Sequence, residues 1–260
     1  MSDLLQAVWL GIIEGVTEFL PISSTGHLLI AEHWLGVRSE LFNVAIQAGA
    51  ILAAVLVFWP RLKALALGLN ERSNRDYLAK LALAFVLTAV GGLIAKKLGA
   101  GLPNTIAPVA SALIIGGVIM LLVEWYLKDR AAVAQATWRV AFWVGLCQIL
   151  AGVFPGTSRS AATIFAAMLA GMTSRPAATE FAFLVGIPTM FAATAYEFMK
   201  TRGSQPVHEN WSALAVAFVV SAAVAFIVVR WLLRYVQTHR FTVFAWYRII
   251  AGIVLLAIAR

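Results

Sequence analysis

The stretch EGVTEFLPISSTGH, residues 14–27, decides the fold, because it puts two glutamates, a proline and a run of polar residues into an otherwise apolar region. That region covers residues 4–33 and is long enough to cross a bilayer, for which a helix needs about 20 apolar residues. Proline and glycine interrupt helices, and a break at membrane depth is tolerated only where protein or a wet cavity surrounds it. We therefore expect residues 4–33 to form a re-entrant helix pair.

A second region, residues 138–172, is apolar and is broken by the sequence PGTS at residues 155–158, so we expect a second re-entrant pair there. Three apolar segments of spanning length follow each pair. The six predicted spans are residues 41–59, 78–96, 107–127, 180–199, 211–233 and 243–260. The composition agrees, since 62% of the residues are hydrophobic and 12% are charged, whereas about 25% of the residues of a soluble domain are charged.

The basic residues predict the topology, because cytoplasmic loops carry an excess of Lys and Arg. Twelve of them fall on the side of the loop at residues 60–80 and six on the other side, so we place that loop in the cytoplasm. The cytoplasmic set is Arg61, Lys63, Arg72, Arg75, Lys80, Lys128, Arg130, Arg139, Arg175, Arg230, Arg234 and Arg240. The other set is Arg38, Lys96, Lys97, Lys200, Arg202 and Arg260.

With this orientation the two broken regions enter from opposite sides. We thus predict an all-α integral membrane protein with six transmembrane helices and two re-entrant helix pairs, arranged as an inverted-topology repeat. Residues 1–260 form a single membrane domain, in which residues 1–127 are the first repeat and 138–260 the second, although sequence similarity between the halves is faint. Folds of this kind place their sites near the midplane, where broken helices meet.

The sequence argues against a nucleic-acid partner, an intramolecular disulfide bond and a cleaved signal peptide. The net charge of +8 is spread between apolar runs and builds no continuous basic face, so we expect no nucleic-acid partner. Cys147 is the single cysteine and has no intramolecular disulfide partner. The first apolar region lacks a preceding basic segment and contains glutamates, so we do not expect it to be a cleaved signal peptide.

The first group of polar residues predicts a cation site. Glu14 and Glu18 are four residues apart, which puts both carboxylates on one helical face, where they can share a divalent cation. Ionisable groups inside a membrane segment are costly and indicate function. The alternative is an interfacial helix whose glutamates lie in water, but the Ser, Thr, Gly and His residues that follow argue against it.

The second group, PGTSRSAAT at residues 155–163, predicts an anion site. Proline, glycine and hydroxyl residues before an apolar run mark a helix N-terminus, whose free N–H groups attract anions. Arg159 adds a guanidinium that binds phosphate in a bidentate manner. The alternative is a plain N-cap, with Arg159 paired to a carboxylate.

These two motifs resemble the paired signatures of the bacterial undecaprenyl pyrophosphate phosphatases, also known as bacitracin-resistance proteins. The resemblance covers Glu14 and Glu18, the stretch from Pro21 to His27, and residues 155–163, in the same order along nearly the whole chain. It implies a multi-pass enzyme of the bacterial cytoplasmic (inner) membrane that converts undecaprenyl pyrophosphate to the monophosphate for cell-wall synthesis. It further implies a divalent cation, Mg²⁺ or Ca²⁺. The count of basic residues, which places the loop at residues 60–80 in the cytoplasm, predicts a site open to the periplasmic side.

The resemblance also implies residue roles. The metal ligands are Glu14 and Glu18, and the catalytic residues are Glu18, Ser24, His27 and Arg159. The substrate-binding residues are Thr25, Gly156, Thr157, Ser158, Arg159, Ser160 and Thr163. Ser24 or a water molecule is expected to attack the phosphorus and His27 to move the proton, because imidazole titrates near neutral pH. A phosphoserine intermediate, a phosphohistidine intermediate and direct attack by water all stay open at the level of sequence.

Other interpretations stay open at the level of sequence. Inverted repeats with broken helices are typical of transporters, so a lipid-carrier transporter or flippase is the main alternative. A phosphatase of the type 2 phosphatidic acid phosphatase class is less favoured, because no His followed closely by Asp comes after Arg159. A purely structural scaffold does not explain the buried charges. A homodimer is neither required nor excluded.

Overall fold

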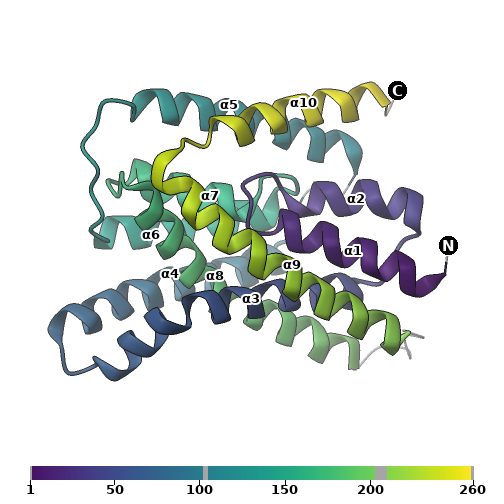
Figure 1. Cartoon of the computed structure of the whole chain (residues 1–260), viewed down its shortest axis with the longest axis horizontal. Coiled ribbons are helices and arrows are strands. Elements are labelled where there is room, and N and C mark those ends of the chain that lie inside the picture. The colour runs from purple at the N-terminus through teal and green to yellow at the C-terminus, as the bar shows by residue number, and fades with distance from the viewer. Residues whose placement is uncertain (1, 102–104, 203–209, 259–260) are drawn as a thin grey trace.

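A computed structural model describes residues 2–101, 105–202 and 210–258. These residues form ten α-helices and no strand (Figure 1). The helices are α1 (Asp3–Thr17), α2 (Ser24–Leu35), α3 (Glu40–Leu67), α4 (Arg72–Lys97), α5 (Ile106–Tyr126), α6 (Trp138–Val153), α7 (Arg159–Leu169), α8 (Arg175–Arg202), α9 (Trp211–Thr238) and α10 (Thr242–Ile258).

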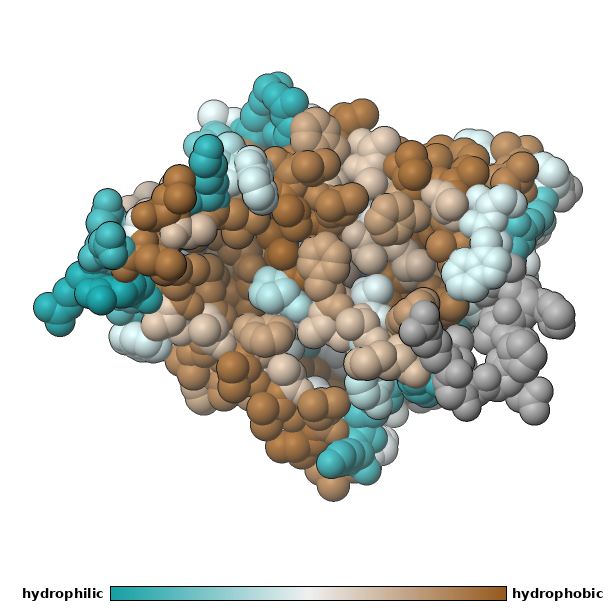
Figure 2. Space-filling model, turned by 90° about the horizontal axis from the view of Figure 1, so that it is seen from below, coloured by the Kyte–Doolittle hydropathy of each residue, from teal (hydrophilic) through white to brown (hydrophobic). Residues whose placement is uncertain are grey.

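The prediction of an all-helical membrane protein is confirmed. Among the described residues, five helices are long and apolar enough to cross a membrane, namely α3, α4, α5, α8 and α9. The sixth predicted span corresponds to α10, which has 17 residues, the lower end of the range for a spanning helix. Positions 259 and 260 of that span lie outside the described residues. Apolar side chains cover much of the face in Figure 2, and hydrophilic ones gather toward its edges.

Two short helical hairpins occupy the places of the two broken regions. The hairpin α1–α2 reaches inward from the end of the molecule where both chain termini lie, and α6–α7 reaches inward from the opposite end (Figure 1). Their turns meet in the middle, where the Ser160 hydroxyl of one hairpin donates a 3.0 Å hydrogen bond to the Leu20 carbonyl of the other. Residues about 140 positions apart are thereby brought into one place.

Small residues let the hairpins approach the long helices closely. Helix α1 packs on α9, and a Cβ at Gly11 would lie 2.6 Å from the Ala217 carbonyl oxygen. Helix α6 packs on α4, and a Cβ at Gly145 would lie 2.8 Å from the Ala84 carbonyl oxygen. In lipid there is little hydrophobic force between helices, so such close backbone packing is what holds them together.

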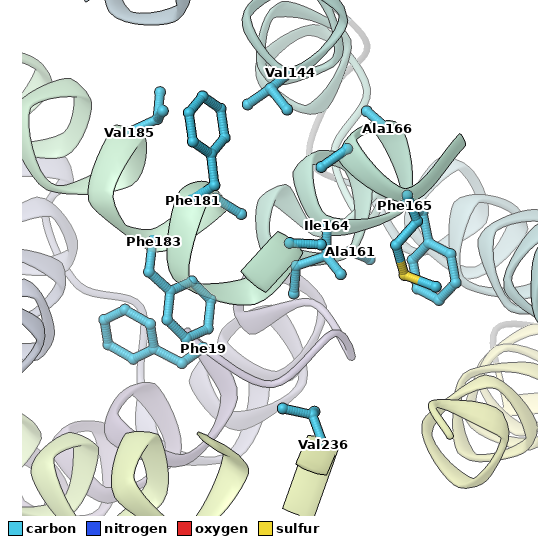
Figure 3. Packing of buried hydrophobic residues seen from close by; sticks show 14 of the residues in the cluster. Phe19, Val144, Ala161, Ile164, Phe165, Ala166, Phe181, Phe183, Val185 and Val236 are labelled. Carbon is cyan, nitrogen blue, oxygen red and sulfur yellow. The ribbon is translucent and has the colours of Figure 1, made fainter. Parts of the chain in front are cut away.

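An aromatic cluster fixes the turn of the first hairpin. Phe19 follows directly on Glu18 and packs edge-on against Phe183 of α8, with ring centroids 5.0 Å apart (Figure 3). Ile164 and Phe165 of α7 belong to the same buried core. Edge-to-face aromatic pairs contribute about 0.5–1.5 kcal/mol beyond the area that they bury. This packing leaves the neighbouring carboxylate of Glu18 little freedom.

Candidate active site

Each hairpin turn ends in a serine with left-handed backbone geometry. Ser23 has φ 74° and Ser158 has φ 68°, and they are the two non-glycine residues with positive φ in the described part of the chain. Each caps the next helix, since Ser23 Oγ accepts from the Gly26 N–H at 3.4 Å and Ser158 Oγ from the Ala161 N–H at 3.3 Å. Such strained geometry persists at sites that need it. It directs the first residues of α2 and α7 into the space between the hairpins.

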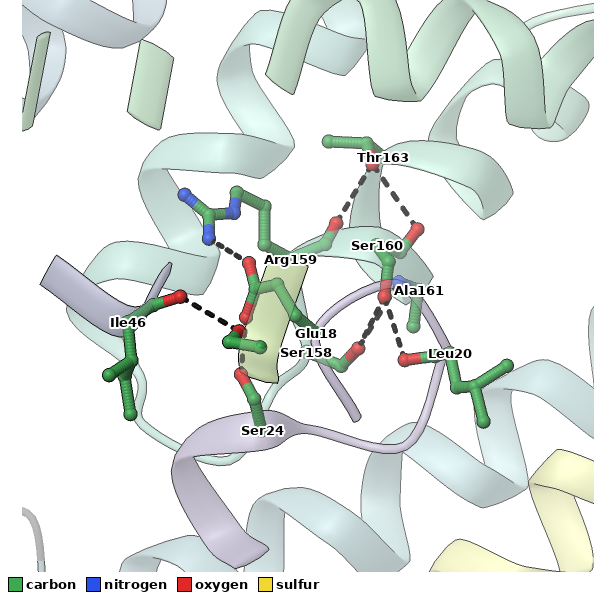
Figure 4. Close-up of polar contacts among 10 residues, drawn as sticks. Glu18, Leu20, Ser24, Ile46, Ser158, Arg159, Ser160, Ala161 and Thr163 are labelled. Carbon is green, nitrogen blue, oxygen red and sulfur yellow. Dashed lines mark hydrogen bonds and ion pairs between the residues drawn. The ribbon is translucent and has the colours of Figure 1, made fainter. Parts of the chain in front are cut away.

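Those first residues, Ser24 and Arg159, converge on Glu18 (Figure 4). The Ser24 hydroxyl donates a 2.6 Å hydrogen bond to Glu18 Oε2, and Arg159 Nη2 forms an ion pair with Glu18 Oε1. The Glu18 side chain is 5% exposed and that of Arg159 is 28% exposed. The predicted acidic and basic motifs therefore meet directly. Arg159 keeps part of its guanidinium open.

The cluster lies at one end of a cavity of about 660 Å³. Glu18, Ser24, Thr25, Ser158 and Arg159 line its polar end. Helices α4 and α8 contribute walls that are mostly apolar, and both continue toward a charged rim. The apolar wall includes Phe85, Ala89, Leu93, Ala192 and Ala193, and the rim includes Lys96, Tyr196 and Glu197. A volume of this size accepts a medium-sized organic headgroup.

Glu14 is fully buried, and neither of its carboxylate oxygens has a hydrogen-bond partner within the protein. Leaving a carboxylate unpaired in a low-dielectric interior is costly, so the position calls for a proton or a cation. The spacing to Glu18 fits a shared divalent cation. The described residues contain no cluster of three His, Cys, Asp or Glu side chains. Further ligands would therefore come from water and a bound phosphate, as is usual for Mg²⁺.

The structure does not bring His27 to this cluster. Its Nδ1 lies 2.7 Å from the Ser23 carbonyl oxygen and its Nε2 lies 2.6 Å from the Tyr247 hydroxyl. A carbonyl only accepts, so Nδ1 carries the proton, and in the neutral ring Nε2 accepts from tyrosine. The ring also stacks on Tyr247 and does not line the cavity. Through this hydrogen bond and ring stacking, His27 connects α2 to α10.

The remaining predicted residues serve mainly to shape the second turn. Gly156 has φ 88°, and a Cβ there would lie 2.6 Å from the Val109 carbonyl oxygen, so only glycine fits. Thr163 donates at 2.8 Å to the Arg159 carbonyl within its own helix. Thr157 is half-buried, and Gly156 and Ser158 line the cavity, whereas Thr157, Ser160 and Thr163 do not.

Arg248 is a residue that sequence reasoning missed, since its place near a span end predicts pairing or snorkelling at the interface. It is instead fully buried. Its guanidinium donates to four backbone carbonyls, those of Pro21 at 3.3 Å, Ala112 at 3.1 Å, Leu113 at 3.4 Å and Gly156 at 3.1 Å. It thus ties both hairpin turns to α5. The available signal was a charged residue within the apolar run of α10.

Comparison with known proteins identifies the family of the chain. The family described as "Bacitracin resistance protein BacA" matches residues 7–254. The chain belongs to this family. The BacA match includes both hairpin turns and Arg248, and the resemblance predicted from the two motifs is confirmed.

Several BacA-type relatives align with almost the entire chain. A protein of Rhizobium etli (strain CIAT 652), named undecaprenyl-diphosphatase, is 60% identical over 258 residues, which are 99% of this chain and 97% of the relative. Proteins with the same name from Xanthomonas euvesicatoria (strain 85-10) and Xylella fastidiosa (strain 9a5c) are 58% and 57% identical. Each alignment covers 98% of this chain, with 97% and 98% of the respective relative.

Proposed function

We propose that this chain hydrolyses undecaprenyl diphosphate to undecaprenyl phosphate and inorganic phosphate, and so recycles the lipid carrier for cell-wall synthesis. The observation that carries the proposal is the Glu18, Ser24 and Arg159 cluster, which places a hydroxyl, a carboxylate and a guanidinium at the polar end of one cavity. Relatives at about 60% identity bear the name of this activity. Membership of the BacA family supports the same substrate class.

The contacts support a division of roles among the residues. Arg159 and the N-terminal amides of α7 bind the terminal phosphate, whose negative charge they offset. The Ser24 oxygen attacks the terminal phosphorus while its proton passes to Glu18, to which it already donates. The bond from that phosphorus to the bridging oxygen breaks, and undecaprenyl phosphate leaves. Water then attacks the phosphoserine and releases inorganic phosphate. His27 supports α2 in this scheme and takes no proton.

Glu14 and Glu18 are the residues that would hold a divalent cation, Mg²⁺ or Ca²⁺, beside the phosphates. Such an ion, when bound, offsets the charge that develops on phosphate oxygens. The support is that the buried Glu14 carboxylate has no hydrogen-bond partner within the protein. We expect phosphate release to cease in excess chelator and to return when Mg²⁺ or Ca²⁺ is added back. Full turnover in chelator would rule out a required exchangeable ion.

We also propose that the halves 1–127 and 138–260 form an inverted repeat, with six spans and two re-entrant hairpins. In such a repeat, α1 corresponds to α6 and α9 corresponds to α4. The packing of α1 on α9 therefore corresponds to the packing of α6 on α4, and both pairs of helices are in contact. The same exchange leaves the pairs α5–α10 and α3–α8 unchanged, and both of these also pack. The cavity rim at Lys96 and Glu197 then faces the periplasm.

This orientation can be tested by cysteine labelling in a Cys147→Ala background. We expect Lys97→Cys to react with a membrane-impermeant maleimide in spheroplasts and Arg72→Cys to react only after permeabilisation, because both positions are exposed and lie at opposite ends of α4. The reverse pattern would overturn the orientation while leaving the enzymatic proposal intact.

The activity itself is tested by phosphate release from undecaprenyl diphosphate by purified protein in detergent. We expect Arg159→Lys to lower kcat/KM by roughly a hundred-fold, because lysine lacks the planar fork that binds two oxygens, and Glu18→Gln to lower it at least as much. An exposed arginine distant from the cavity, Arg234→Lys, serves as the matched control. Carrier movement by wild-type protein without phosphate release would favour a transporter and overturn the proposal.

A further inference from the structure

The two hairpins share a sequence pattern that their packing reveals. Gly11 of α1 lies against the backbone of α9, as Gly15 also does, and Gly145 of α6 lies against the backbone of α4 in the same way. Superposing these two positions aligns AVWLGIIEGVTEFLP, residues 7–21, with AFWVGLCQILAGVFP, residues 141–155, without a gap. Ala, Trp, Gly and Pro then coincide at the same relative positions. In this alignment Gln148 takes the place of Glu14.

Gln148 has the same unusual state as Glu14. It is 3% exposed, and neither its Oε1 nor its Nε2 has a hydrogen-bond partner within the protein. A buried amide normally finds partners, since leaving its donors and acceptor unpaired is unfavourable. The two equivalent positions of the hairpins thus both hold a polar group that the protein itself does not satisfy.

Unlike Glu14, Gln148 lines the cavity, together with Glu18, Ser158 and Arg159. Among the described residues around the cavity, it is the one with buried polar side-chain atoms that lack a partner. Two turns of chain further on, Pro155 and Gly156 line the same space. The residue with the unpaired amide therefore belongs to the wall of the same cavity that Arg159 lines.

We infer that Gln148 binds the diphosphate headgroup of the lipid substrate, an inference that rests on the proposed function. Its amide Nε2 has two N–H donors, and phosphate oxygens are acceptors. The first hairpin supplies carboxylates on the cation side of the headgroup, and the second supplies Arg159 and a neutral amide on the phosphate side. A carboxylate at position 148 would repel the phosphates. The amide has the same shape without that charge.

The test compares Gln148→Leu and Gln148→Glu with wild type. The leucine variant loses the donors, so we expect KM to rise roughly ten- to one-hundred-fold, the range for a hydrogen bond to a charged group, with a smaller change in kcat. We expect the glutamate variant to be weaker still, because it adds a negative charge. Cys147→Ala, the neighbouring change on α6 at a residue that does not line the cavity, is the control and should keep wild-type KM.

Thermal unfolding without substrate separates binding from a structural role. Because the amide has no partner within the protein, we expect Gln148→Leu to unfold at or above the wild-type temperature, and to gain less stability than wild type from added farnesyl diphosphate. A leucine variant with lowered unfolding temperature and unchanged KM would overturn the inference. So would an active Gln148→Glu beside an impaired Gln148→Leu, since that pattern indicates a metal ligand. Wild-type protein that releases no phosphate at all would instead refute the proposed function.

Discussion

At the scale of single residues, Glu18 has a double role because it accepts from Ser24 of its own hairpin and from Arg159 of the other. Removing one partner from a buried ion pair leaves an uncompensated charge, which costs about 3–5 kcal/mol in other proteins. In this protein an incoming phosphate can bind the open part of the Arg159 side chain while the ion pair with Glu18 is kept, because Arg159 is partly open to the cavity. Glu18 Oε2, which already accepts from Ser24, is then placed to take the Ser24 proton.

This arrangement predicts that Ser24 is the nucleophile. We expect Ser24→Ala to lower kcat by at least about a thousand-fold, while headgroup binding persists through Arg159, because only the attacking oxygen is lost. Rapid quenching of the wild-type reaction with substrate labelled at the terminal phosphate should trap label on residue 24. Substantial turnover by the alanine variant would instead indicate direct attack by water.

At the scale of elements, the left-handed serines that directly precede α2 and α7 orient the reactive groups. An L-residue in left-handed geometry costs roughly 1–2 kcal/mol. Both serines partly offset this cost by capping the helix that follows. The geometry is repeated in both hairpins, with φ values of 74° and 68°.

The cost of this geometry is measurable at Ser23. We expect Ser23→Gly to be more stable than Ser23→Ala by about 1 kcal/mol, because glycine adopts positive φ without strain and is a tolerable cap, whereas alanine keeps the strain and loses the cap. Thermal unfolding of both variants in the same detergent checks the order. Equal stability of the two variants would mean that the backbone at this position relaxes.

The sequence predicts the helices of this protein well and its side-chain contacts less well. Apolar length and the two proline-containing breaks predict every helix that the structure describes, since length and backbone chemistry act locally. The proximity of the two motifs also follows from the sequence, because broken helices of this kind meet near the midplane. The ion pair of Arg159 with Glu18 is only the alternative to a phosphate-binding role at the level of sequence. By contrast, the contacts of His27 with Tyr247 and of Arg248 with two turns depend on how α10 packs, which no local pattern encodes. The sequence similarity between the two hairpins is faint. It can be aligned because Gly11 and Gly145 make equivalent contacts with their partner helices.

At the scale of the whole molecule, Arg248 connects the two halves. Its guanidinium binds carbonyls in both turns and in α5, so it sets the distance between the hairpins. It touches no residue of the charged cluster. Its role is therefore one of positioning.

We expect Arg248→Met to lower both the unfolding temperature and kcat, because four buried carbonyls lose their donor. Arg248→Lys should recover part of the stability, since lysine supplies up to three donors, but little of kcat, since it cannot hold both turns in the same geometry. In the lysine variant, the unfolding temperature should thus recover in part while kcat stays low. Full recovery of kcat by lysine would show that the spacing of the turns is not critical.

The position of Arg248 in α10 also has a consequence for biosynthesis. The chain is made from its N-terminus, and α10, which is synthesised after both hairpins, carries the side chain that joins the two turns. A nascent protein that already contains both motifs therefore still lacks a finished reaction centre. Hydrolytic competence arrives only after α10 has been made and has packed, so products truncated before Arg248 are not expected to consume the carrier lipid.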